Sequence, residues 1–249
     1  MNLTQIVNFE LAPNCPHAAK HPFCPSGQRD TSKMVGMNDG TIVQTAVQLY
    51  TSHGFTGLIG WHYYNEPMRS QERMIELMKR IYTQVPMARF WLWSNLIEHV
   101  ADTQIPYQWF EGITLSAYDE HPKNSTWLAK DRLKRFRIFI HAQEDDGRSA
   151  ERPAKSGPCA RQFLEMDIDY SGDVRMCCHD WKGASCIGNI VDDKLDAVIA
   201  KWQETRVNCL RGKDMPDCCG KCGTRYGVNT AEPEITKRIQ EYVKEITNE

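Results

Sequence analysis

Cysteines are the residues of this 249-residue chain best able to do chemistry, and they fall into two groups. Cys15 and Cys24 stand near the N-terminus with two histidines, His17 and His21, between them. All the others lie within residues 159–222: Cys159, Cys177, Cys178, Cys186, Cys209, Cys218, Cys219 and Cys222. In a reducing compartment, clustered cysteines more often ligate metal than form disulfides. The pattern therefore predicts metal binding in preference to a secreted disulfide module.

Four cysteines of the second group have a spacing suited to one site. Cys159 and Cys177 bracket a predicted hairpin, whereas Cys219 and Cys222 form a C-x-x-C turn whose glycines let the backbone bend close to a metal or sulfide. Four thiolates suit either structural zinc or an iron–sulfur cluster, and spacing alone does not choose between them. The remaining cysteines are each expected to be small buried hydrophobes rather than ligands: Cys178, Cys186, Cys209 and Cys218.

Composition limits the class of partner. The formal net charge is −2, which argues against nucleic acid, because such binding is dominated by phosphate neutralisation. No apolar run approaches the roughly 20 residues of a membrane span, which predicts no membrane partner. The first 20 residues lack a charged segment followed by an apolar core, so no secretory signal is expected. We therefore expect a cytoplasmic protein.

The first half of the chain alternates between strand and helix patterns. Strands separated by helices imply parallel βα units, and five such units suit an open, partial (β/α) barrel of the α/β class better than a closed eight-stranded one. In such barrels the chemistry lies at the carboxyl ends of the strands. The predicted strands are residues 3–11, 57–64, 89–95, 112–118 and 136–142. The predicted helices are residues 39–54, 70–85 and 124–135, with a short helical stretch from Ile97.

A polar, Pro- and Gly-bearing stretch at residues 143–158 predicts the boundary between two modules. We expect a barrel domain over residues 1–145 and a smaller domain over residues 146–249. The second begins with a hairpin predicted over residues 163–178, whose turn is Tyr170-Ser171-Gly172-Asp173, because the flanking residues alternate with period two. Helices are predicted at residues 194–208 and at 232–246.

The tail pattern resembles the SPASM or twitch modules that follow radical SAM cores. The run C-x12-G-x4-C from Cys159 through Gly172 to Cys177 is similar to their opening, and "CGKC" is similar to their closing C-x-x-C. A full SPASM module has a third cysteine six residues later, where this chain has Val228. The resemblance therefore implies the shorter twitch form, with one auxiliary [4Fe–4S] cluster. Its implied ligands are Cys159, Cys177, Cys219 and Cys222.

The first module is similar to the radical SAM core in its strand ends. "GLIGWHYYNEPM" resembles the second strand and the turn that meets the amino group of S-adenosylmethionine, which assigns Asn65 and Glu66 to that ligand; an ordinary strand-ending turn is the alternative. "FWLWSN" resembles the third strand, whose Ser94 and Asn95 would face the same ligand. "ITLSAY" resembles the fourth strand, with Ser116 as a ribose contact.

The stretch after the first strand departs from the family pattern, which is C-x3-C-x2-C. Here the spacing is C-x5-H-x2-C, so the resemblance implies that Cys15, His21 and Cys24 hold a second [4Fe–4S] cluster. Imidazole can ligate iron in a cluster and raises its reduction potential. Two alternatives stay open: a weak or altered cluster, and a degenerate site in a barrel that makes no radicals. His17 is a second choice for the histidine ligand.

The resemblance implies an oxidoreductase that uses a 5′-deoxyadenosyl radical to abstract hydrogen from a small, sugar-like molecule, with the auxiliary cluster accepting an electron as in a dehydrogenase. Arg148 or Arg152 would contact the substrate or the methionine carboxylate, with a solvated charge in the linker as the alternative for each. A flavodoxin or ferredoxin would supply the electron. The alternatives are a peptide-modifying enzyme of the same family and a non-catalytic iron–sulfur or zinc protein.

Overall fold

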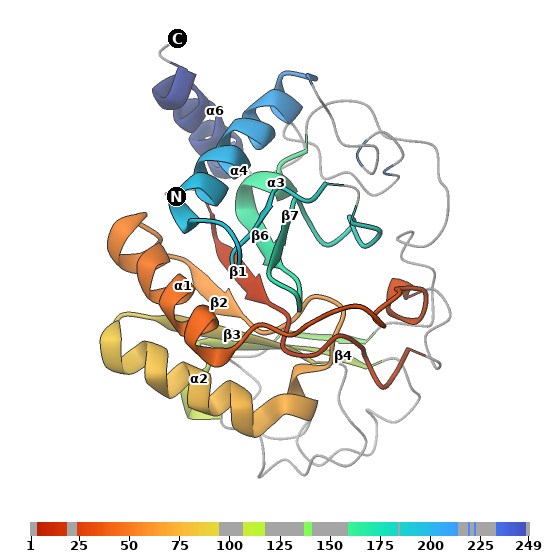
Figure 1. Ribbon diagram of the computed structural model, residues 1–249. Helices are drawn as coiled ribbons and strands as arrows, with labels where there is room; N and C mark the ends of the chain where they lie inside the picture. Colours follow the sequence, from red (N-terminus) through yellow and green to blue (C-terminus); the bar gives the residue numbers. More distant parts are fainter. Residues whose placement is uncertain are drawn as a thin grey trace.

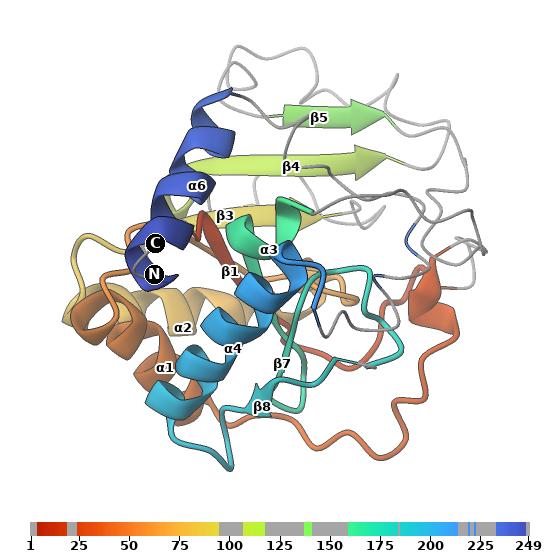
Figure 2. The same ribbon diagram turned by 90° about the horizontal axis from the view of Figure 1, so that it is seen from above.

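The computed structural model describes residues 4–18, 24–94, 107–117, 137–140, 159–183, 185–213, Cys219, Cys222 and 233–247. Its centre is one eight-stranded sheet with the strand order β5-β4-β3-β2-β1-β6-β7-β8 (Figures 1 and 2). The strands are β1 (Ile6–Phe9), β2 (Leu58–Gly60), β3 (Arg89–Ser94), β4 (Gly112–Ala117), β5 (Arg137–Ile140), β6 (Glu165–Ile168), β7 (Asp173–Arg175) and β8 (Gly188–Asn189).

The first six strands pair in parallel, which confirms the predicted partial (β/α) barrel. Figure 2 shows β3, β4 and β5 side by side at one edge of this sheet. Both faces of β1 are buried, as is typical of parallel strands. Val7 and Phe9 pack into the hydrophobic core, whereas Asn8 and Glu10 are buried polar residues at the alternate positions. One face of the sheet is therefore apolar, and the other carries polar groups.

Two helices cover the apolar face (Figure 1). Helix α1 (Asp39–Ser52) begins where the Asn38 side chain accepts a hydrogen bond from Thr41 N, and it is followed by Gly54 at φ 61°. Helix α2 (Gln71–Gln84) follows Ser70 as predicted, but the Ser70 side chain makes no capping hydrogen bond. A 3₁₀ turn, η2 (Pro67–Ser70), leads into it instead. Two further 3₁₀ turns are η1 (Pro25–Gly27) and η4 (Tyr107–Trp109).

The predicted hairpin forms from β6 and β7, with one difference at its start. The strand pattern begins at Phe163, but the short helix α3 (Arg161–Leu164) occupies this position and β6 starts at Glu165. Helix α3 buries the Phe163 ring completely, which alternation along the sequence does not reveal. The turn is held by Asp169, whose Oδ1 accepts hydrogen bonds from two backbone N–H groups, and by Gly172 at φ 91°.

Strand β6 lies directly beside β1, with Asn8 opposite Asp167. The sheet therefore continues from the first predicted module into the second, and the proposed boundary between residues 145 and 146 stays a prediction. Helices α4 (Leu195–Leu210) and α6 (Pro233–Thr247) follow close to the predicted ranges. The helices predicted over residues 124–135 and from Ile97 lie outside the described residues.

Helices α3, α4 and α6 meet around one arginine. Arg206 of α4 is buried between the rings of Trp202, Phe163 and Tyr242, with its guanidinium carbon 4.1 Å from the Trp202 centroid and 4.5 Å from that of Tyr242. The C-terminal helix is thereby fixed to the hairpin module. Among the described helices none combines the length and apolarity that crossing a membrane requires.

Candidate functional site

The predicted tail ligands lie on two segments of the chain that approach each other. Cys177 follows β7, and burial raises the pKa of its thiol well above the ordinary value, with the neighbouring Cys178 and Cys219 acting in the same direction. Cys159 and Cys177 both lie within electrostatic range of Arg161. Cys222 is joined to Cys219 by a backbone hydrogen bond from Cys222 N to Cys219 O of 3.4 Å. The hairpin and the C-x-x-C turn therefore meet.

The four predicted ligands of the tail are all thiols, a donor set that structural zinc and iron–sulfur clusters both use. Among the described residues no three Cys, His, Asp or Glu side chains approach closely enough to hold one metal ion. Four thiolates around a single zinc would have to converge tetrahedrally on it. The thiolates of a [4Fe–4S] cluster each bind a different iron and so lie further apart. The nine cysteines that the structure describes form no disulfide with one another.

Arg161 is a member of this site that the cysteine spacing does not reveal. Its Nη1 donates a hydrogen bond to Cys178 Sγ at 3.0 Å and pairs with Glu165 Oε1 at 3.3 Å. Negative charge on Cys178 and then on Glu165 raises the pKa of the Arg161 guanidinium despite burial, and Cys177 and Cys159 add to the effect. A positive charge therefore lies beside the thiols.

The remaining cysteines differ among themselves. Cys209 is buried in the core, as expected of a small hydrophobe. Cys186 is exposed, so the expectation of burial is wrong there; it lies just before β8 at the surface, with its Sγ 3.7 Å from Gly188 O. Cys178 is half-buried and bonded by Arg161. Cys218 lies outside the described residues.

The N-terminal pair of cysteines follows β1. Cys15 is buried, and its carbonyl accepts a hydrogen bond from Ala18 N at 3.1 Å, which starts a turn. Cys24 precedes the 3₁₀ turn η1, and its Sγ lies 3.2 Å from Ser26 Oγ. His17 is buried as well. His21 lies outside the described residues, so its role as the third ligand stays a prediction.

The ends of β2 and β3 are joined through two of the predicted cofactor residues. Ser94 Oγ donates a hydrogen bond of 2.7 Å to Glu66 Oε1, which also accepts one of 3.1 Å from Met68 N. The Glu66 residue is only 1% exposed. The Asn65 side chain stabilises the same turn, because it accepts a hydrogen bond from Tyr63 N and donates one to Trp61 O. These residues therefore shape the turn, and their contact with a ligand stays a prediction.

Of the other predicted site residues, the structure describes Ser116 alone. Ser116 belongs to β4, where it is opposite Phe139 of β5. Its position on a central barrel strand agrees with the expectation, whereas its ligand contact is not tested. Asn95, Arg148 and Arg152 lie outside the described residues.

A buried ion pair stands where the loop after β1 meets the end of β2. Arg29 donates two hydrogen bonds to the Glu10 carboxylate, which also accepts from Tyr64 N and Tyr170 N at 3.0 Å each. Burial raises the pKa of Glu10, and its bonds to Arg29 oppose that rise. The Arg29 guanidinium also lies over the Tyr63 ring, 5.4 Å from its centroid. Sequence spacing gave no signal for this pair.

Two tyrosines connect the end of β2 to the segment that carries Cys177 and Cys178. Tyr64 Oη donates a hydrogen bond to the carbonyl of Cys178, and Tyr63 Oη donates one of 3.3 Å to the carbonyl of Asp180. The two tyrosines immediately precede Asn65 and Glu66 in the chain. The predicted cofactor turn and the predicted cluster segment are therefore in direct contact.

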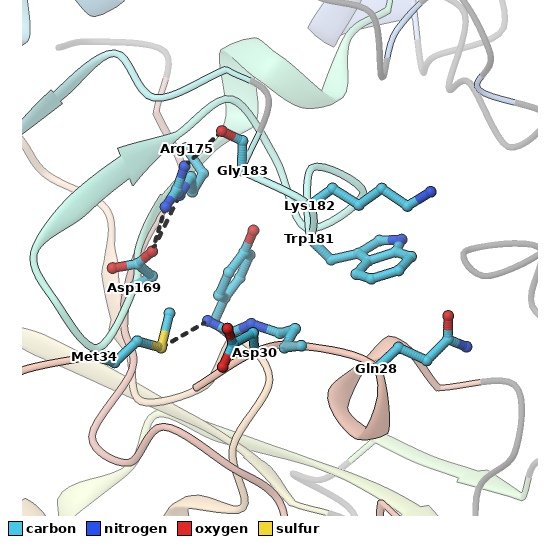
Figure 3. Close-up of a pocket in the computed structure, with 10 residues that line it drawn as sticks. Gln28, Asp30, Met34, Asp169, Arg175, Trp181, Lys182 and Gly183 are labelled. Atoms are coloured by element: carbon cyan, nitrogen blue, oxygen red, sulfur yellow. Dashed lines mark hydrogen bonds and ion pairs between the residues drawn. The ribbon is translucent and has the colours of Figure 1, made fainter. Parts of the chain in front are cut away.

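A cavity of about 480 Å³ lies between the two cysteine-bearing segments (Figure 3). One wall comes from the residues after Cys24, and the opposite wall from the residues after Cys178. Figure 3 shows Trp181 and Lys182 on one side of the view, above Gln28, and the Arg175–Asp169 ion pair on the other side. Its volume is in the range of small-molecule sites. The lining residues are Gln28, Arg29, Asp30, Met34, Tyr63, Asp169, Arg175, Trp181, Lys182 and Gly183.

The polar face of the sheet carries a second feature that the sequence did not predict. Asp167 of β6 accepts a hydrogen bond of 2.7 Å from Asn8 Nδ2 of β1. Burial raises the pKa of Asp167 to about 8, and the neighbouring Glu165 adds to the rise, whereas the Asn8 bond opposes it. Within the described part of the chain, Asp167 Oδ2 has no hydrogen-bond partner. Burial therefore favours the protonated form of Asp167.

Comparison with known protein families identifies the tail. Residues 159–223 match the SPASM family, described as an iron–sulfur cluster-binding domain. The matched segment begins at Cys159 and includes all four predicted auxiliary ligands. It lies within the predicted second module. The curated proteins compared with this chain gave no match.

Comparison with solved structures identifies the fold of the whole chain. It is similar to the crystal structure of BtrN in complex with AdoMet and 2-DOIA, with a TM-score of 0.71 at 18% sequence identity, covering 89% of this chain and 94% of that one. A selenomethionine BtrN structure in an open conformation matches with a TM-score of 0.62 at 17% identity, covering 89% and 93%. The chain therefore has the fold of BtrN over nearly its whole length.

Proposed function

We propose that this chain, a radical SAM-type barrel joined to a SPASM-type iron–sulfur domain, is an oxidoreductase that removes hydrogen from a small, sugar-like molecule. The fold shared with BtrN, whose structure contains AdoMet and 2-DOIA, supports both the cofactor and the substrate class. The cavity of about 480 Å³ supports a small molecule over a long peptide segment. The SPASM match supports an auxiliary cluster.

One observation carries the proposal: the two cysteine-bearing segments border the same cavity. Arg29 lies five residues after Cys24, and Trp181 lies three residues after Cys178. Tyr63 stands between them and bonds to Asp180 O. A molecule in this cavity would lie between the two cofactor sites, as an oxidation that uses both of them requires.

The residues proposed to hold the cofactors lie on the two cysteine-bearing segments. Cys15, Cys24 and His21 would bind the first [4Fe–4S] cluster, and the four tail cysteines would bind the auxiliary one. When bound, these groups supply the electron that cleaves S-adenosylmethionine to a 5′-deoxyadenosyl radical and accept the electron that the substrate gives up. An external one-electron donor such as flavodoxin or ferredoxin would supply the first of these electrons.

The protein's own part is to position the cofactors and the substrate. Glu66 and Ser94 fix the turn after β2, so that its backbone carbonyls would accept from the ammonium group of S-adenosylmethionine. Asn95 and Ser116, at the ends of the next strands, would contact the same ligand. Arg148 or Arg152 would contact the substrate or the methionine carboxylate. The Tyr64 bond to Cys178 O holds the auxiliary segment against the barrel.

Anaerobic reconstitution followed by an assay for 5′-deoxyadenosine tests the proposal. With a chemical reductant and S-adenosylmethionine, the wild-type protein should form 5′-deoxyadenosine, and the Cys24→Ala variant should not. The Cys186→Ser variant, which changes an exposed thiol, should behave like the wild type. Binding of about four irons per chain without any 5′-deoxyadenosine would instead identify a non-catalytic iron–sulfur protein, and bound zinc would overturn the cluster assignment.

A further inference from the structure

The arrangement of charges beside the tail cysteines suggests a role for one arginine. Arg161 is the first residue of α3, two positions after Cys159, and its side chain is 33% exposed. Its Nη1 hydrogen bonds to Cys178 Sγ while pairing with Glu165 on the other side. The positive charge of this ion pair therefore lies against the thiol of Cys178, and the Glu165 carboxylate lies close enough to act electrostatically on Cys177.

We infer that Arg161 raises the reduction potential of the auxiliary cluster and thereby makes that cluster a better acceptor of the substrate's electron. The inference rests on the proposed function. In the proposed oxidation an α-hydroxyalkyl substrate radical would give one electron to the auxiliary cluster and one proton to solvent to become a ketone, and the cluster would become one unit more negative. An external one-electron carrier would later reoxidise it. A nearby fixed positive charge stabilises the reduced form more than the oxidised form, because the reduced form carries more negative charge.

Glu165 must be treated together with Arg161. The carboxylate pairs with Arg161 at 3.3 Å, and burial raises the pKa of Glu165 while Arg161 opposes the rise. Removing Arg161 alone would let Glu165 take up a proton, and the two charge changes would cancel in part. The clean comparison is therefore between Glu165→Gln and the double variant Arg161→Gln/Glu165→Gln, since neither has a carboxylate to reprotonate.

The experiment measures the midpoint potential of the auxiliary cluster by EPR-monitored redox titration. The full chain carries Cys24→Ala throughout, so that the auxiliary cluster gives the only signal. At a fixed solution potential the double variant should show at least a tenfold lower ratio of reduced to oxidised cluster than Glu165→Gln, which is 59 mV for a one-electron couple. The Glu165→Gln variant should have a higher midpoint potential than its parent, the Cys24→Ala protein. Arg161→Lys should keep most of the effect on the midpoint potential, and Arg80→Gln, which changes a 40% exposed side chain of α2, should leave the potential unchanged.

The outcomes separate the inference from the proposed function. If the Cys24→Ala protein binds no iron, the auxiliary cluster and the inference fall together. If it binds a normal cluster whose potential is the same in Glu165→Gln and in the double variant, only the inference falls. Should the double variant fail to assemble a cluster, the single Glu165→Gln variant decides, because an unchanged potential there overturns the inference as well.

Discussion

The Arg29 guanidinium donates two hydrogen bonds to the buried Glu10 carboxylate, from Nη1 to Oε1 at 2.6 Å and from Nη2 to Oε2 at 3.0 Å. Glu10 stands just past the end of β1, and Arg29 lies beyond the predicted N-terminal cluster segment. The pair therefore closes the loop that carries Cys15 and Cys24 back onto the sheet. Because Glu10 also bonds to Tyr64 N and Tyr170 N, it joins this loop to the end of β2 and to the hairpin turn.

Removing Arg29 should destabilise the protein strongly. Breaking one side of a buried ion pair leaves an uncompensated charge and costs about 3–5 kcal/mol of unfolding free energy. We expect Arg29→Met to show a loss of this order in urea unfolding at pH 7. The matched control is Arg89→Met, which breaks the half-exposed pair with Glu111 and should cost about 1 kcal/mol or less. Equal losses in the two variants would show that Glu10 does not depend on Arg29.

Asp167 should make stability depend on pH. Its pKa is about 8 in the folded protein against an ordinary value of 3.8, so between these values the folded state holds a proton that the unfolded state has lost. Stability from this group is therefore present at acid pH and lost as the pH rises toward 8, at up to about 1.4 kcal/mol per pH unit.

The Asp167→Asn variant measures this contribution. Its unfolding free energy relative to the wild type should increase between pH 5 and pH 8, because the amide has no proton to lose. The exposed Asp192→Asn variant is the control and should follow the wild type. A wild-type curve parallel to that of Asp167→Asn over this range would mean that Asp167 is ionised in the folded state.

The tail cysteines should differ in their effect on iron content. Cys219→Ala should lose the auxiliary cluster, about four irons per chain, and should loosen the tail, because cluster binding and folding are coupled. Cys186→Ser should retain the full iron content, since that thiol is exposed. Iron analysis and circular dichroism of anaerobically purified protein provide the measurement. Full iron retention in Cys219→Ala would remove this residue from the ligand set.

The predicted histidine ligand has a direct test. If His21 binds iron, His21→Cys should keep the N-terminal cluster and lower its reduction potential, because thiolate donates more charge to iron than imidazole does. The measurement is a redox titration in the Cys219→Ala background, in which only the first cluster is present. A variant that gains a cluster absent from its parent would show instead that the native site is degenerate, and the enzyme assignment would fall with it.

Sequence periodicity was sufficient for most of the fold. The prediction of helices α1 and α2 and of the five parallel strands follows from the spacing of apolar residues, with a period of 3.6 residues in helices and of 2 in strands. These periods are local, because they depend only on residues within the same element. The prediction of the four tail ligands rests on the resemblance of the cysteine spacing to SPASM modules, and the hairpin turn follows from Gly172, whose φ of 91° only glycine adopts easily. Helix α3 was missed because Phe163 is buried by contacts with distant helices, and alternation of residue type alone does not distinguish that from a strand.

The contacts that organise the site were decided only by the tertiary structure. Strand β6 lies beside β1 although their residues are far apart in the sequence, which brings Asp167 onto Asn8. Tyr64 meets Cys178 for the same reason. Arg161 bonds to a thiol 17 positions away, across the hairpin. Such pairs depend on the order of strands in the sheet and on the path of each turn. The type of a charged or hydroxyl residue in the sequence therefore does not identify the residue that it will contact in the packed sheet.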